Sequence, residues 1–422
     1  MTAAPATEPP FAAAAPRVFT IDPGRPFLTD LAARLDAALG PALPEARIYV
    51  PTRRAARGLA DAFRAAASAR GVDAVLLPRI AALGDVDDDE HAAFAGPGAA
   101  AREAAPAVSK SARRMTLARL VAAKDRAFAG HENWPAAFAA AGELGKLLDS
   151  FYAEEVPFAA LDAIAPEGFA AHWKRSLDFL EIVTAAWPAY LQEIGRTDPA
   201  ARQSEAVRAE IKFLRGHAGD TPVVVAGTTG SAPAVADLIG CAASLPRGVV
   251  VLPGVDRALA ADAAGWAAID ASHPQAGLKA LLERIDVAPD AVRPWRAGTP
   301  EARARLLSLA LRPAEATSDW LDQIGAETAR DPGLAAACDG LTLIEAADEN
   351  EEASVIALAF REALETPGRT AMLITPDRLL ALRVAARMRR WGVVVDDSGG
   401  APFANTPCGT YLRLVADWLA AP

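Results

Sequence analysis

Cysteine is scarce in this chain. Three occur among 422 residues, Cys241, Cys338 and Cys408, and no two of them share a CxxC spacing. Zinc ribbons and thiol redox sites place cysteines in closely spaced pairs, so the sequence predicts neither kind of site. Widely separated cysteines are typical of inert packing thiols in a reducing compartment. We therefore expect a cytoplasmic protein whose cysteines do no chemistry.

Long apolar runs and a basic excess are also lacking. No stretch reaches the roughly 18 consecutive apolar residues that a membrane-spanning helix needs, so the sequence predicts no membrane contact. The chain has 43 Lys and Arg against 53 Asp and Glu, which gives a net charge of −10. This overall charge provides no argument for a nucleic-acid partner. Any such site has to be a local basic patch.

What the chain does have is apolar material, 52% of its residues, much of it alanine. Because single cores rarely grow beyond roughly 250–300 residues, the length predicts two to three domains. Residues 1–16 are rich in Ala and Pro and lack the basic start of a signal peptide, so we expect a disordered tail there. The last residues follow an apparent helix without a polar tail, which suggests a fragment of a longer protein.

Short apolar runs that end in turn residues predict an α/β fold with parallel sheets. In the first part of the chain these runs are 18–21, 48–50, 75–77, 223–226 and 249–252. Helical spacing dominates between them, so we expect a first α/β domain (17–90 and 216–300) interrupted by a helical insert (91–215). A helical connector (301–340) then leads to an incomplete second α/β domain (341–422), with runs at 341–346, 371–375 and 392–397.

The sequence DPGRP, residues 22–26, lies between a predicted strand and helix, where a phosphate-binding loop belongs. A working loop needs two glycines, a lysine for the phosphates and a hydroxyl for magnesium. Here only Gly24 and Arg25 could contribute to phosphate binding, and the two prolines of the segment have no backbone N–H to donate. We interpret the segment as an ordinary βα turn or a degenerate phosphate loop. Asp256 follows a later strand without the glutamate that an ATPase would place beside it.

Two other segments invite a ligand hypothesis. One is a hydroxyl-rich turn before a predicted helix, which offers an anion-binding site or a plain helix cap: Gly227, Thr228, Thr229 and Ser231. The other is an acidic run that reads as a metal site or a solvated loop, and the loop is favoured: Asp85, Asp87, Asp88, Asp89 and Glu90.

One arrangement occurs once in each half of the chain: a short apolar run, a Thr/Pro turn and a helix that carries arginines. The first copy supplies Thr52, Arg53, Arg54 and Arg57. The second supplies Thr375, Arg378 and Arg383. Arginines and hydroxyls at such loops can hold the phosphates of DNA. The alternative is structural, with the arginines capping helices or pairing with acidic neighbours such as Asp61 and Asp377.

Two α/β domains, the first interrupted by a helical insert, resemble the core of superfamily 1 helicases, which are built from RecA-like domains. Individual sequence segments point to a narrower family. After residue 16 the chain resembles the AddB family, the B subunits of bacterial AddAB helicase–nucleases, in its alphaproteobacterial form. The resemblance rests on phrases and their order, among them VFTIDPGRPFLTDLAARL, YVPTRRAARGLADAF, VVVAGTTGSAPAVADLI and LITPDRLLALRVAARM.

This resemblance implies a role in double-strand break repair by homologous recombination. The implied partners are a motor subunit, AddA, and single- and double-stranded DNA. Magnesium, and in some members an iron–sulfur cluster, would belong to a nuclease domain that has no counterpart in these residues, so we expect no cofactor, metal or catalytic residue here. Two alternatives stay open: a scaffold for the motor subunit that touches no DNA, and an enzyme built from paired Rossmann-like domains.

Overall fold

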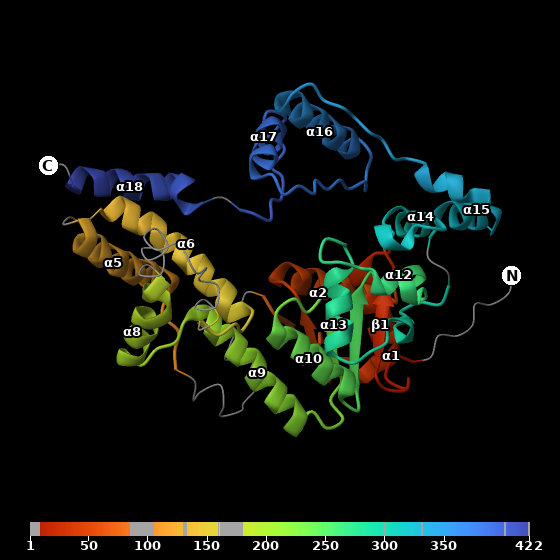
Figure 1. Cartoon of the computed structure of the whole chain (residues 1–422). Coiled ribbons are helices and arrows are strands. Elements are labelled where there is room, and N and C mark those ends of the chain that lie inside the picture. Colours follow the sequence, from red (N-terminus) through yellow and green to blue (C-terminus); the bar gives the residue numbers. More distant parts are fainter. Residues whose placement is uncertain are drawn as a thin grey trace. The chain divides into compact units, whose positions relative to one another are not determined.

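The structure is a computed structural model of the chain (Figure 1). It describes residues 9–84, 105–129, 133–158, 160, 180–298, 301–330, 332–400 and 402–420. The chain forms two compact units, Met1–Cys338 and Asp339–Pro422, each of which is described by itself. Within the described ranges, no helix is both long and apolar enough to cross a membrane.

A single six-stranded sheet forms the centre of the first unit. Its strands are β1 (Val18–Ile21), β2 (Arg47–Val50), β3 (Arg79–Ala82), β4 (Val223–Ala226), β5 (Gly248–Pro253) and β6 (Arg293–Pro294). Every pair is parallel, and the order is β3-β2-β4-β5-β1-β6. The predicted α/β class is confirmed, with a strand order consistent with a RecA-like domain. Because β4 pairs with β2 and β5 with β1, the segments before and after the insert build one sheet.

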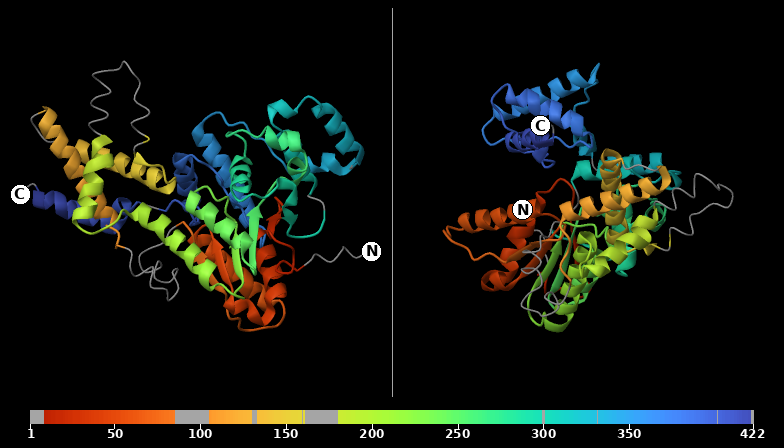
Figure 2. Two further views of the ribbon diagram at one scale, coloured as in Figure 1. Left: turned by 60° about the horizontal axis from the view of Figure 1, so that its bottom comes forward. Right: turned by 90° about the vertical axis from the view of Figure 1, so that its left-hand side faces the viewer.

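Helices cover both faces of this sheet, which explains why its central strands are continuous apolar runs. One face packs against α1 (Phe27–Leu39) and α2 (Arg53–Ser68). The other packs against α9 (Pro199–His217), α10 (Pro233–Ser244) and α13 (Ala276–Arg284). Figure 2 shows the first pair in red and α10 and α13 in green, on opposite sides of the strands.

Most predicted strands of this unit form, but the one expected at 75–77 does not. The third strand is Arg79–Ala82, after Pro78, and Leu76 is 76% exposed. Proline has no backbone N–H to donate to a ladder, so pairing starts beyond it, with the Arg79 N–H donating to the Ala46 carbonyl at 2.9 Å. β6, only two residues long, was not predicted.

The segment expected as a disordered tail is partly packed. Residues 1–8 lie outside the described part, but Ala13 is buried in the core beneath α1, and Phe11 packs against the same cluster. Arg247 lies over the Phe11 ring, 5.7 Å from its centroid. Apolar contact holds residues 9–16 to the domain although their composition is typical of a tail.

The insert is helical, as predicted. Its helices are α5 (Lys110–Ala129), α6 (Trp134–Ala153), a π-helical turn (Ile182–Ala186), α8 (Trp187–Glu193) and α9. Leu144 and Leu148, one turn apart on α6, are buried with Trp187 in one core. The π-helical turn ends where Pro188 enters, because proline interrupts the regular hydrogen-bond ladder. Trp173 is followed in the sequence by Lys174 and Arg175 and is thus a candidate for base stacking, but it lies outside the described residues.

One buried polar cluster links the helices of the insert. The Asp198 carboxylate is fully buried and caps α9 by accepting from the Ala200 N–H at 2.9 Å. It also accepts from Trp187 Nε1 at 3.0 Å and lies 2.9 Å from Arg113 Nε. Arg113 in turn contacts Asp149 of α6 at 2.6 Å. Burial raises the pKa of the Asp198 carboxyl, although the attraction of Arg113 opposes this shift.

The connector belongs to the first unit and contains α14 (Ala302–Ala310) and α15 (Trp320–Arg330). The second unit begins two residues earlier than predicted. Its helices are α16 (Glu349–Leu364), α17 (Arg378–Arg389) and α18 (Pro407–Ala420).

The three strands expected in the second unit are not formed in its described residues. Residues 341–346, 371–375 and 393–396 are extended but join no ladder. Leu373, Val393 and Val395 pack against α16 and α17, whereas their neighbours Ile374 and Val394 are each 87% exposed. Buried and exposed side chains thus alternate in these segments as they do in strands. A β-ladder, however, also needs a neighbouring strand to share its hydrogen bonds.

Candidate nucleic-acid interface at the carboxyl edge of the sheet

The carboxyl ends of the strands form the natural ligand edge of this sheet. The connections that leave β1 and β2 run toward the β3 edge, whereas those that leave β4 and β5 run toward the β6 edge. Parallel sheets bind ligands where the direction of the connections reverses in this way. Four loops gather here: 22–26 after β1, 51–52 after β2, 227–232 after β4 and 254–256 after β5.

These loops pack tightly against one another. The Gly254 N–H donates to the Ile21 carbonyl at 2.9 Å, and a Cβ on Gly254 would lie 3.3 Å from Pro23. Gly227 adopts a φ of +76°, and a Cβ there would lie 3.2 Å from the Phe27 ring and 3.6 Å from Pro51. Proline and phenylalanine side chains therefore fill the space between the loops.

This packing predicts a strong effect at Gly227. Gly227→Ala should lower the free energy of unfolding by about 2–4 kcal/mol, since a left-handed backbone costs an alanine roughly 1–2 kcal/mol and overpacking adds to it. The matched control is Gly219→Ala, where φ is +49° but nothing lies within 4 Å of the added Cβ. Denaturant titration of both variants measures the difference. Equal losses would show that the loops are not closely packed.

The degenerate phosphate loop is held by its own ion pairs. Arg25 Nε donates to Asp30 at 2.5 Å, and this bond raises the pKa of the guanidinium. Asp30, in the first turn of α1, also contacts Arg296 at 3.1 Å, and Asp22 contacts Arg257 at 3.1 Å. The pairs made by Arg296 and Arg257 join residues 266 and 235 positions apart, so no local sequence signal could have revealed them.

A further carboxylate lies against this loop. Gly24 has a φ of +85°, and a Cβ there would be 3.1 Å from Glu301 Oε2. Asp22 and Asp30 lie near the same loop, but each is paired with an arginine, so their charges are largely offset. The Glu301 carboxylate beside Gly24 would repel a phosphate bound at this loop.

The hydroxyl-rich turn after β4 is closed by one of its own side chains. Thr228 Oγ1 accepts from the Gly230 N–H at 3.2 Å, while Thr229 and Ser231 are exposed. α10 begins at Pro233, with Ala232 at the N-cap and no side-chain cap bond, so the plain cap interpretation is wrong. Anion binding at this turn stays a prediction.

Asp256 caps a short helix. It accepts from the backbone N–H groups of Ala258 and Leu259 at the start of α11 (Arg257–Ala260). This carboxylate is therefore occupied by the backbone.

The start of α2 is the basic part of this edge. Thr52 is the N-cap and accepts from the Ala55 N–H at 3.1 Å. The first turn of α2 contains no acidic residue. Arg54 and Arg57 are exposed, and Arg57 makes no ion pair or side-chain hydrogen bond among the described residues. Asp61, considered as a pairing partner for these arginines, contacts Arg64 instead.

Arg53 is half-buried at the first position of the same helix. The three arginines and the helix N-terminus therefore combine formal charge with the positive end of the helix dipole.

In the second unit the predicted residues are engaged in local contacts. Thr375 Oγ1 accepts from the Asp377 N–H at 3.0 Å, and Asp377 caps α17. Arg378 lies 2.6 Å from Asp397, and Arg383 lies 2.5 Å from Glu349. Both side chains stay partly exposed, at 40% and 34%. The second copy therefore fits the structural alternative, in which the arginines pair with acidic residues, better than the first copy does.

Within the described ranges, no group of three or more His, Cys, Asp or Glu is placed to hold a metal ion. The acidic run at 85–90 lies outside these ranges. No protein-family model matches the chain, and no curated protein matches it.

Proposed function

We propose that the carboxyl edge of the first unit binds the phosphate backbone of single-stranded DNA. The observation that supports this most is the start of α2, a capped helix N-terminus with Arg53, Arg54 and Arg57, no acid in its first turn, and a position at the reversal of the sheet. Backbone N–H groups and arginines of this kind position a strand without reading its sequence. The salt dependence of oligonucleotide binding by arginine variants tests it.

In this proposal the chain is the non-motor, helicase-like subunit of a helicase–nuclease that processes double-strand breaks in the cytoplasm, with a separate motor subunit as its partner. The resemblance to the AddB family supports the assignment. The lack of a phosphate-loop lysine beside Gly24 and Arg25 supports a subunit that does not use ATP, and the Glu301 carboxylate next to Gly24 would repel a bound phosphate.

ATP binding is therefore expected to be absent. A site with a Kd of about 10 µM would raise the free energy of unfolding by about 2.7 kcal/mol at about 1 mM ligand. We expect no ATP-dependent rise in the melting temperature of the chain, with magnesium present. A rise that is lost in a Gly24→Val variant, or ATP hydrolysis by the purified chain, would contradict this part of the proposal.

The second copy is proposed as a weaker contact. Arg378 and Arg383 would have to exchange Asp397 and Glu349 for DNA phosphates, which offsets part of the gain. Exposed ion pairs of this kind contribute only about 0–1 kcal/mol to stability, so exchanging their carboxylates for DNA phosphates costs little free energy.

The scaffold alternative makes the opposite prediction for the same edge. If the chain only holds its motor partner, neutralising the α2 arginines leaves oligonucleotide affinity and its salt dependence unchanged. The Rossmann-like enzyme alternative needs a glycine-rich loop whose backbone is open to close approach by a cofactor. Pro23 packs on Gly254 and Phe27 on Gly227, so these glycines are covered by side chains.

A further inference from the structure

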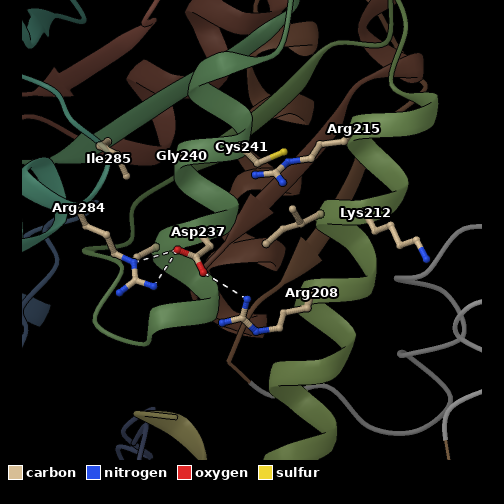
Figure 3. Close-up of a pocket in the computed structure, with 10 residues that line it drawn as sticks. Arg208, Lys212, Arg215, Asp237, Gly240, Cys241, Arg284 and Ile285 are labelled. Carbon is tan, nitrogen blue, oxygen red and sulfur yellow. Dashed lines mark hydrogen bonds and ion pairs between the residues drawn. The ribbon is translucent and has the colours of Figure 1, made fainter. Parts of the chain in front are cut away.

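A second basic surface lies on the helical layer that covers the other face of the sheet. α9, α10 and α13 enclose a groove of about 590 Å³ (Figure 3). Its lining is Arg208, Ile211, Lys212, Arg215, Ala236, Asp237, Gly240, Cys241, Arg284 and Ile285. Four of these side chains are cationic and one is a carboxylate, a net charge of +3 in a chain whose net charge is −10.

The single carboxylate is shared between two of the arginines. Asp237 lies 2.9 Å from Arg284 and 3.4 Å from Arg208, as the dashed lines in Figure 3 show. Arg208 also donates from Nε to Glu155 at 2.8 Å. The charge of Asp237 is thus neutralised inside the groove, and Arg208 is held in place by two acids.

Two cations are left without such partners. Lys212 and Arg215 are exposed, and neither makes an ion pair with a carboxylate among the described residues. They are three positions apart on α9, but Figure 3 shows Arg215 turned toward Cys241 and Lys212 pointing to the outer side of the helix, away from the other labelled side chains. Arg215 contacts the thiol of Cys241, and burial raises the pKa of this thiol although Arg215 opposes the shift.

The lining also indicates which anion suits the groove. It contains no aromatic side chain, so it offers no platform on which a base could stack. Arginine forks and a lysine ammonium are the groups that bind phosphate oxygens. The groove begins near the proposed DNA edge: Asp237 is four residues into α10, about 6 Å from the helix start at 1.5 Å per residue.

We propose that this groove is a second phosphate-binding site, at which Arg215 inside the groove and Lys212 on the outer side of α9 hold the backbone of a nucleic-acid strand independently of its sequence. The choice of nucleic acid as ligand rests on the proposed function of the carboxyl edge. The site itself adds a contact on other elements, because its cations come from α9 and α13 and none of them comes from the strand-to-helix loops.

The test measures the affinity of a fluorescent oligothymidine of about 20 nucleotides at several salt concentrations. For single strands each phosphate contact contributes about 0.7 to the slope of log K against log salt. Lys212→Ala/Arg215→Ala should lower the slope by about 1.4. The control Lys146→Ala/Arg330→Ala removes the same charge from two side chains that are each 74% exposed on α6 and α15, and should leave the slope unchanged.

A footprint separates this proposal from that of the carboxyl edge. Acetylation of Lys212, followed by mass spectrometry, should be suppressed by the oligonucleotide both in the unaltered chain and in Arg54→Ala/Arg57→Ala. Protection that persists in that variant supports the groove even if the variant binds with unchanged salt dependence. Unchanged slope and no protection of Lys212 would overturn the groove proposal, as would binding of poly-glutamate, but not of the oligonucleotide, that depends on Lys212 and Arg215.

Discussion

Replacing Asp198 with alanine is expected to lower the free energy of unfolding by about 3–5 kcal/mol, the cost of leaving a buried charge without its partner. Arg113 is only 8% exposed and would lose its fully buried partner. The Trp187 Nε1–H would lose its acceptor at 3.0 Å, and α9 would lose its N-cap. Because these contacts come from α5, α8 and α9, the whole insert should loosen.

The shift of the denaturant midpoint, together with hydrogen exchange in α5 and α8, measures this effect. Asp198→Asn is the matched variant: its single carbonyl oxygen can keep either the cap on the Ala200 N–H or the acceptor for Trp187, and it removes the charge facing Arg113. Asp149 and the Gly145 carbonyl still contact Arg113, and we expect a smaller loss than with alanine. A loss below about 0.5 kcal/mol for Asp198→Ala would show that this cluster does not organise the insert.

Neutralising the arginines at the start of α2 is expected to have the largest effect on function. Arg53→Ala/Arg54→Ala/Arg57→Ala should lower the salt slope for a single-stranded oligonucleotide by about 2.1, three contacts at about 0.7 each. Extrapolated from about 1 M to about 0.1 M salt, this slope corresponds to a loss of affinity of roughly 100-fold. Anisotropy titrations over that range give both quantities.

Two variants keep this prediction interpretable. Arg53 is half-buried, so Arg54→Ala/Arg57→Ala, at exposed positions, separates loss of DNA contact from loss of structure. We expect that pair to lower the slope by about 1.4. Arg64→Ala lies on the same helix but is paired with Asp61, and should change the slope little. Equal effects of Arg64→Ala and Arg57→Ala would indicate general electrostatics and no specific path.

Much of the sheet was predictable because its signals are local. β4 and β5 are continuous apolar runs rich in valine, and β1 (VFTI) is interrupted only by the buried Thr20, which is the pattern that burial on both faces favours. The strand after Pro78 was placed too early because apolar residues at 75–77 resemble a strand, although proline delays pairing to Arg79. The extended segments of the second unit have the same apolar pattern but no partners, which no single segment can reveal.

The candidate site was predictable only in part, for the same reason. The arginines and the capping Thr52 stand next to a strand end, so their position at the sheet edge follows from the order of strand, turn and helix. Asp22 and Asp30 are close to Gly24 in the sequence, but Glu301 comes from the connector, and Arg296, which pairs with Asp30, also comes from a distant position. Nor does any local motif mark the groove of Lys212 and Arg215, because three separate helices form it.

The central claim is that a DNA strand lies against the start of α2 without any need for ATP. Photo-crosslinking a 4-thiothymidine oligonucleotide to the chain in the absence of nucleotide, followed by peptide mapping, tests it most directly. The account predicts crosslinked peptides that contain Thr52 to Arg57, and their loss in Arg54→Ala/Arg57→Ala. Crosslinks that map elsewhere and never to this segment, or that form only when ATP is added, would contradict it.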